Sequence, residues 1–272
     1  REGNRMNVER LRKIIAYSRQ HHEEIASKVK HFCSYTEIDD DSSMLNILQI
    51  VRSSFRRKGF LLLEIPIADD EIGALCYKGD GFGYVVMNSS LPKVNANFAL
   101  GHEIYHVFFQ ESGFVSRVEF SDDHYYEHEE EYAANLFAGM LLMPELSFRR
   151  MYAKFKAESG GDETDTLLRL MSYYELPYMA VLIRCLELGL MSGTTAVEQI
   201  GHADRAWIRQ RLAELWLDPN IMEASMKDDY LRLESLVERI GHECVEDDYL
   251  NERSLQKVLR NMRDIYGKIR GK

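Results

Sequence analysis

The strongest constraint on this chain is a helix expected over residues 94–110, which contains two histidines four residues apart. Its centre reads His102-Glu103-Ile104-Tyr105-His106, and the residues around this motif are uncharged. In an α-helix, residues i and i+4 lie on one face, so both imidazoles can reach one ion. The uncharged flanks indicate a buried helix, which a rigid and dry site requires. They disfavour the ordinary interpretation, in which both histidines only pack in the core or face solvent.

His102 and His106 are therefore candidate zinc ligands, because zinc binds imidazole nitrogen and a catalytic zinc keeps one coordination position open for water. Manganese or iron would fit the same kind of ligand set. Glu103 follows the first histidine and lies beside the metal rather than on it, where it can take a proton from the bound water. A purely structural metal site has no use for such a base, so the motif predicts a hydrolytic enzyme.

A third protein ligand is expected from the next helix, over about residues 127–142, because the histidine-containing extension found in metzincins is absent. Glu131 is favoured, since alanines three and seven residues later would let this helix pack closely against the motif helix. Asn135 would lie one turn further on, placed to orient a ligating histidine. Glu127 and Glu130 remain alternatives, because acidic residues at a helix start commonly complement the helix dipole.

The remaining pattern predicts an α+β fold with a small, mostly antiparallel sheet followed by a helical C-terminal region. Helices are expected over residues 5–33, 43–58, 94–110 and 127–142 and within 164–190 and 201–270, and strands over 60–65, 72–77 and 82–88. Residues 111–126 are expected to form an irregular acidic loop. Trp207 and Trp216 are expected in the core.

Composition argues against several classes of protein. The net charge of −10 gives no overall attraction for nucleic-acid phosphates, and the basic residues after position 252 are interpreted as a solvated helix face. The four cysteines contain no C-x-x-C pair, which favours a reducing cytoplasm without disulfides. No apolar run approaches the roughly 18 residues of a membrane helix, and the chain start lacks a signal-peptide pattern.

Two stretches resemble the ImmA/IrrE family of metallopeptidases. The first contains Asn-Ser-Ser-Leu-Pro at 88–92 and continues through the H-E-x-x-H motif at 102–106. The second, at 131–144, has a Glu, two residues, Ala-Asn-x-Phe-Ala and a closing Leu-Leu-Met-Pro. This combination is much more specific than H-E-x-x-H alone, and the similarity covers about residues 46–190. One departure is Ile104-Tyr105, where small or aliphatic residues are commoner in the family.

The resemblance implies a zincin-like (gluzincin) arrangement of active-site helices with Glu131 as the third ligand. It implies a zinc-dependent endopeptidase in which zinc-bound water, activated by Glu103, attacks the peptide carbonyl. Family members often cleave a helix-turn-helix transcriptional repressor encoded nearby, so a protein substrate of that kind and a role in transcription regulation are expected.

Four parts of the chain are expected. They are an N-terminal helical segment (1–45), a zincin-like metallopeptidase core (46–150), a helix-turn-helix-like region packed on the core (151–192) and a helical C-terminal extension (193–272). The third part resembles a DNA-binding motif, but Arg184 is the one basic residue in its second helix. Packing is therefore the better interpretation, and direct nucleic-acid binding is not expected.

Some alternatives stay open. The chain could instead be a non-catalytic, metal-containing regulator, or a toxin–antitoxin component that binds a repressor or DNA. An oxyanion donor is expected, and the sequence does not choose among His124, Tyr125, Tyr126 and His128. The strand at 82–88 either offers an edge to an extended substrate or is an ordinary sheet strand.

Overall fold

The computed structural model describes residues 7–38, 47–70, 72–79, 82–110, 114–119, 129–202 and 204–271. The helices are α1 (Val8–Thr36), α2 (Ile47–Arg57), α3 (Lys93–Phe109), α4 (Glu129–Leu142), α5 (Glu145–Glu158), α6 (Glu163–Tyr174), α7 (Tyr178–Glu187), α8 (Gly193–Ile200), α9 (Arg205–Glu214), α10 (Tyr230–Glu246) and α11 (Glu252–Ile269), with a 3-10 helix η3 at Pro219–Met222. The strands are β1 (Phe60–Ile65), β2 (Ile72–Lys78), β3 (Gly83–Asn88) and β4 (Phe114–Glu119). The predicted α+β class is confirmed.

The sheet has four strands in the order β1-β3-β2-β4. β1 runs parallel to β3, while β2 is antiparallel to both β3 and β4, so most pairings are antiparallel as expected. β3 has a hydrogen-bonded neighbour on each side. Of the two interpretations of residues 82–88, the ordinary sheet strand is confirmed and the edge for a substrate is wrong, because β1 occupies the side of β3 that β2 leaves open.

β4 is an element that the sequence interpretation missed, since its residues were expected to belong to an irregular loop. The strand pairs with β2 from Ile72↔Glu119 to Lys78↔Phe114, with an irregularity between Ile72 and Ala74. Without it, β2 would present a row of unpaired backbone N–H and C=O groups. Phe114, Val115 and Val118 are residues that favour strands, so a local signal for β4 was present and was outweighed by the acidic and polar residues that follow it.

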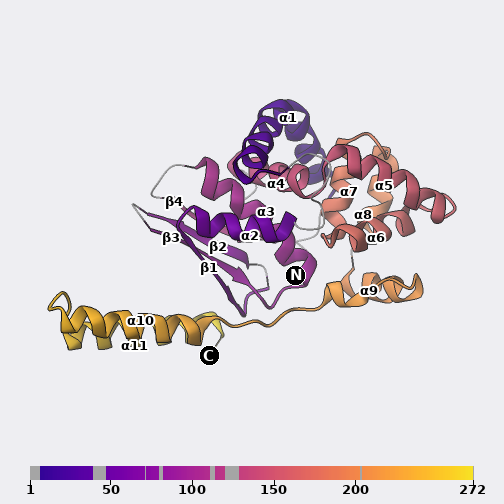
Figure 1. Ribbon diagram of the computed structural model, residues 1–272. Coiled ribbons are helices and arrows are strands. Elements are labelled where there is room, and N and C mark those ends of the chain that lie inside the picture. The colour runs from indigo at the N-terminus through magenta and orange to yellow at the C-terminus, as the bar shows by residue number, and fades with distance from the viewer. Residues whose placement is uncertain are drawn as a thin grey trace.

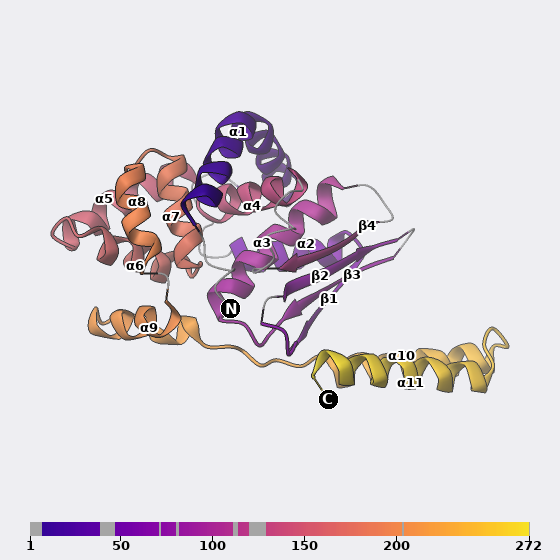
Figure 2. The same ribbon diagram turned by 180° about the vertical axis from the view of Figure 1, so that it is seen from behind.

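The elements form layers above the sheet (Figure 1). α2 and α3 cover one face, α4 lies across α3, and α1 lies over α4. Figure 2 shows the same order from behind. α3 is buried almost all round, from Val94 to Val107, because its residues are mostly apolar on every side. A helix enclosed in this way holds its polar side chains rigidly.

Close contact between α3 and α4 depends on small residues. A Cβ atom added at Gly101 would lie 2.7 Å from a side-chain carbon of Leu142 and 3.5 Å from the Cβ of Ala138. Ala134 is fully buried in the same interface. The glycine and the alanines therefore bring the two helices together at the H-E-x-x-H motif.

α5 to α8 form a helical group beside the core. Asp162 caps α6 by accepting a hydrogen bond from the Asp165 backbone N–H. α7 packs against α1 and α4. Its Arg184 is 3% exposed, donates to the carbonyl oxygen of Met143 at 3.1 Å and pairs with Glu187 at 3.0 Å. This arginine holds helices together and is not available to a phosphate group.

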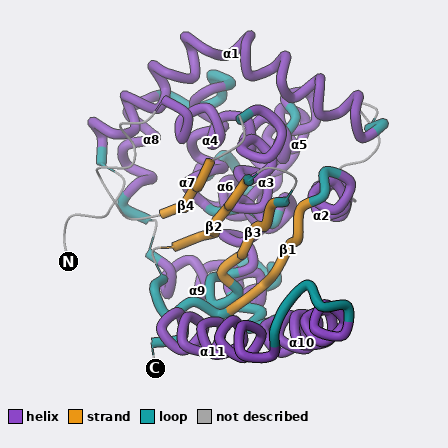
Figure 3. The backbone as a smooth tube through the Cα atoms, turned by 90° about the vertical axis from the view of Figure 1, so that its left-hand side faces the viewer, coloured by secondary structure: helices purple, strands orange, loops and turns teal. Residues whose placement is uncertain are grey.

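The C-terminal part reaches the opposite face of the sheet. An extended segment after η3 leads to α10 and α11, which lie side by side beneath β1 (Figures 1 and 3). The Asp229 carboxylate accepts from the backbone N–H of Glu64 at 3.0 Å, and the Asp229 N–H donates to the carbonyl of Glu64 at 2.9 Å. This pairing satisfies part of the free edge of β1.

Trp216 contradicts the prediction that it belongs to the core, because it is 96% exposed. α9 ends at Glu214, and Trp216 has a left-handed backbone with φ 59°. The helix that contains Trp207 therefore ends before Trp216, so the two tryptophans do not lie on one helix face. All four cysteines are free. None of the helices within the described ranges has the length and apolar character needed to cross a membrane.

Candidate metal centre

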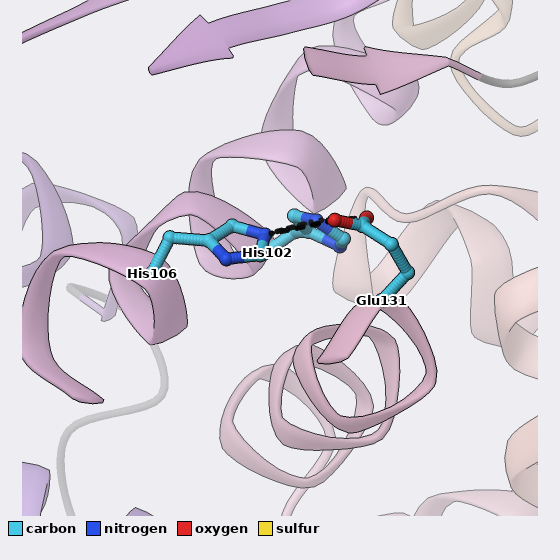
Figure 4. A group of neighbouring side chains, drawn as sticks. All are labelled: His102, His106 and Glu131. Atoms are coloured by element: carbon cyan, nitrogen blue, oxygen red, sulfur yellow. Dashed lines mark hydrogen bonds and ion pairs between the residues drawn. The ribbon is translucent and has the colours of Figure 1, made fainter. Parts of the chain in front are cut away.

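Three side chains from two helices meet at the α3–α4 interface (Figure 4). His102 and His106 come from consecutive turns of α3, and their Nε2 atoms are 2.9 Å apart. Glu131, in the first turn of α4, places one carboxylate oxygen 3.2 Å from His102 Nε2 and the other 3.6 Å from His106 Nε2. Among the described residues, these three form the one group of His, Cys, Asp or Glu that could hold a metal ion.

The spacing suits a tetrahedral metal site. Bonds of about 2.0–2.2 Å, as zinc makes, place ligand atoms roughly 3.3–3.6 Å from one another. Two of the three separations here, 3.2 and 3.6 Å, lie at or next to that range, and the third, 2.9 Å, is shorter. Both histidines are buried, and Glu131 is 16% exposed. The donor set therefore fits a metal ion held between two buried imidazoles and a partly exposed carboxylate.

Each histidine also has a contact at Nδ1, the ring nitrogen that faces away from the three-residue group, and in both cases the partner is an amide side chain. Asn135 Oδ1 is 2.9 Å from His102 Nδ1, and Gln110 Oε1 is 2.8 Å from His106 Nδ1. Asn135 was expected in such a position, whereas Gln110 was missed. The available signal was spacing, since Gln110 is four residues beyond His106 on the same helix face.

The other candidates from the sequence do not join this group. The Glu130 carboxylate accepts a hydrogen bond from Gln110 Nε2 at 2.7 Å instead of meeting the histidines. Glu127 and the four candidate oxyanion donors at positions 124–126 and 128 lie outside the described residues.

Glu103 is fully buried, and apart from the weak thiol donor of Cys76 neither of its carboxylate oxygens has a hydrogen-bond partner among the described residues. Burial raises the pKa of Glu103 to about 8, although the nearby His102 acts in the opposite direction. The buried thiol of Cys76, on β2, lies beside it, and burial together with the Glu103 charge raises the pKa of that thiol. A buried carboxylate with so little hydrogen bonding is costly to fold, so its presence points to a task other than stability.

The two histidines respond differently to the same surroundings. Burial disfavours the charged form of His102, but the Glu131 carboxylate outweighs this effect and raises its pKa. Burial, together with the nearby His102, lowers the pKa of His106 to about 4. Because the two rings are so close, one proton shared by the pair is more favourable than a charged proton on each ring. A bound cation would take the place of that shared proton.

Comparison with known families supports this interpretation. Residues 55–186 match the model of the peptidase M78 family, described as the IrrE N-terminal-like domain. The matched range contains His102, His106 and Glu131, as well as Glu103. No curated protein matches the chain. The family supports a peptidase role in general terms, and a peptidase acts on a protein substrate. The chain therefore carries a domain of the peptidase M78 family, the IrrE N-terminal-like domain, over residues 55–186.

Proposed function

We propose that this protein is a zinc-dependent endopeptidase whose active site lies at the α3–α4 interface. The observation that supports it best is the meeting of two imidazoles and a carboxylate beside a second, fully buried carboxylate that has no partner except the weak thiol donor of Cys76. A metal site that only stabilised the fold would gain nothing from the unpaired Glu103, which costs free energy to bury.

His102, His106 and Glu131 would hold the zinc ion. When bound, zinc supplies a Lewis acid that polarises a carbonyl oxygen and lowers the pKa of water toward about 7. Asn135 accepts a hydrogen bond from His102 Nδ1 and so directs the opposite ring nitrogen to the ion.

Glu103 would act as the general base. Its carboxylate takes a proton from the attacking water and passes it to the nitrogen of the leaving amine. Apart from the weak thiol donor of Cys76 beside it, neither oxygen has a hydrogen-bond partner among the described residues, so the carboxylate is available for this transfer. Its burial keeps bulk solvent from competing for the proton.

We further propose that the substrate is a regulatory protein, such as a helix-turn-helix transcriptional repressor, in the cytoplasm. The IrrE N-terminal-like domain supports this choice. The net charge of −10 and the burial of Arg184 support a protein partner over nucleic acid.

The test is proteolysis of a candidate substrate, namely any helix-turn-helix protein encoded beside the gene. Zinc-loaded wild type is compared with Glu103→Gln, with and without a chelator. We expect cleavage that disappears with either change. Tight binding of that protein by both forms without any cleavage would identify a non-catalytic regulator instead.

A further inference from the structure

Gln110 connects His106 to the start of α4. It caps the C-terminal end of α3, where its backbone N–H reaches the His106 carbonyl oxygen at 3.3 Å. Its side chain has a separate set of contacts. Oε1 lies 2.8 Å from His106 Nδ1, while Nε2 donates to the Glu130 carboxylate at 2.7 Å.

The chemistry of these contacts fixes the direction of each hydrogen bond. An ionised carboxylate only accepts, so the NH₂ end of the Gln110 amide must face Glu130. The amide oxygen then faces His106, and an oxygen there requires a proton on Nδ1. In a neutral imidazole, Nε2 is then left with a lone pair, which points at His102 and Glu131.

We propose that Gln110 and Glu130 are positioning residues that together hold the His106 ring in its metal-binding tautomer. The proposal rests on the proposed function in taking His106 as a zinc ligand. Glu130 is exposed and precedes Glu131 in the first turn of α4. This turn therefore supplies the ligand Glu131 and also Glu130, which holds the Gln110 side chain against His106 on α3. Partners of this kind are worth about 10–100-fold in metal affinity.

The competing interpretation is structural, in which Gln110 only ends α3 and Glu130 only decorates the start of α4. The two interpretations are separable, because the cap uses the backbone of Gln110 and survives a change of side chain. Gln110→Met keeps the length of the side chain and removes both amide contacts. Glu130→Ala removes the anchor, and Glu130→Gln restores an acceptor oxygen for the Gln110 amide.

Glu129 provides the matched control. It is exposed in the same first turn of α4, and the Gln110 amide donates to Glu130 rather than to it. Changing Glu129 to Ala or Gln therefore alters the charge near the site without breaking the contact with Gln110.

The experiment measures zinc affinity by competition with a chelating indicator. We expect Gln110→Met to weaken zinc binding about 10–100-fold. Glu130→Ala should weaken it several-fold more than Glu129→Ala, and Glu130→Gln should match Glu129→Gln. Wild-type affinity in Gln110→Met, or equal losses in Glu130→Ala and Glu129→Ala, would overturn the proposal.

A second readout needs neither zinc nor activity. Nitrogen-15 NMR of the metal-free protein distinguishes Nδ1–H from Nε2–H histidine. We expect His106 to be the Nδ1–H form in wild type and a mixture in Gln110→Met. If wild type bound no zinc, the proposed function would fail while this spectrum still tested the positioning role. An Nε2–H form in wild type would refute that role directly.

Discussion

Replacing Glu103 by glutamine should stabilise the metal-free protein at neutral pH. The carboxylate is fully buried and, apart from the weak thiol donor of Cys76, has no hydrogen-bond partner among the described residues, and burial raises its pKa from 4.5 to about 8. At pH 7 this group is ionised in the unfolded chain and mostly protonated in the folded one. Folding must therefore bind a proton, whereas glutamine is neutral in both states and avoids this cost.

The size and sign of this effect on the unfolding free energy follow from the linkage between proton binding and folding. Since the folded-state pKa lies above the unfolded value, stability from this group is complete below pH 4.5 and is lost as the pH rises toward 8. At about 1.4 kcal/mol per pH unit, the loss at pH 7 is on the order of 3 kcal/mol. Glu103→Gln should escape that loss, so its advantage over wild type should grow with pH.

Urea denaturation of chelator-treated protein at pH 5, 6, 7 and 8 measures this directly. The difference in unfolding free energy between Glu103→Gln and wild type should increase by roughly 2–3 kcal/mol from pH 5 to 7. Glu129→Gln, at an exposed position, should show no such increase. A constant difference across this range would show that Glu103 is solvated in the folded protein, and the reasoning would be refuted.

Three further outcomes are expected. Asn135→Leu should weaken zinc affinity about 10–100-fold in a chelator competition, because the His102 ring loses its acceptor; unchanged affinity would count against this role. Gly101→Ala should lower the unfolding free energy by about 1–3 kcal/mol, since the added Cβ would come within 2.7 Å of an α4 leucine. Gly139→Ala, where a Cβ meets nothing within 4 Å, should be stabilising instead, and equal effects of the two changes would contradict the packing. Arg184→Met should cost about 3–5 kcal/mol in urea denaturation, because Glu187 remains buried without its partner, and a loss below about 1 kcal/mol would contradict this.

The sequence predicted the elements around the motif well, because their signals are local. The motif at 102–106 with its uncharged flanks lies in a buried helix as expected, and the three strands before it formed within a residue or two of their expected bounds. The ImmA/IrrE resemblance is confirmed by the family match. The roles of Glu103, Glu131 and Asn135, and the four-part division of the chain, stay predictions.

What the sequence did not reveal depends on contacts between distant segments. β4 contains strand-favouring residues such as Val115 and Val118, but its pairing with β2, about 40 residues earlier, cannot be read from its own short segment. Gln110 contacts both α3 and α4, and its role depends on Glu130 lying opposite, which spacing along one helix cannot establish. The contact between Asp229 and Glu64 joins residues 165 positions apart, beyond any local pattern.

The most direct test of the central claim measures two quantities on the same samples of three forms of the protein. They are the zinc content and the cleavage of the proposed substrate, a helix-turn-helix protein. Wild type should bind one zinc and cleave, Glu103→Gln should bind one zinc and not cleave, and Glu131→Ala should lose both zinc and cleavage. Cleavage by Glu103→Gln, or by protein without metal, would contradict a zinc peptidase that uses Glu103 as its base.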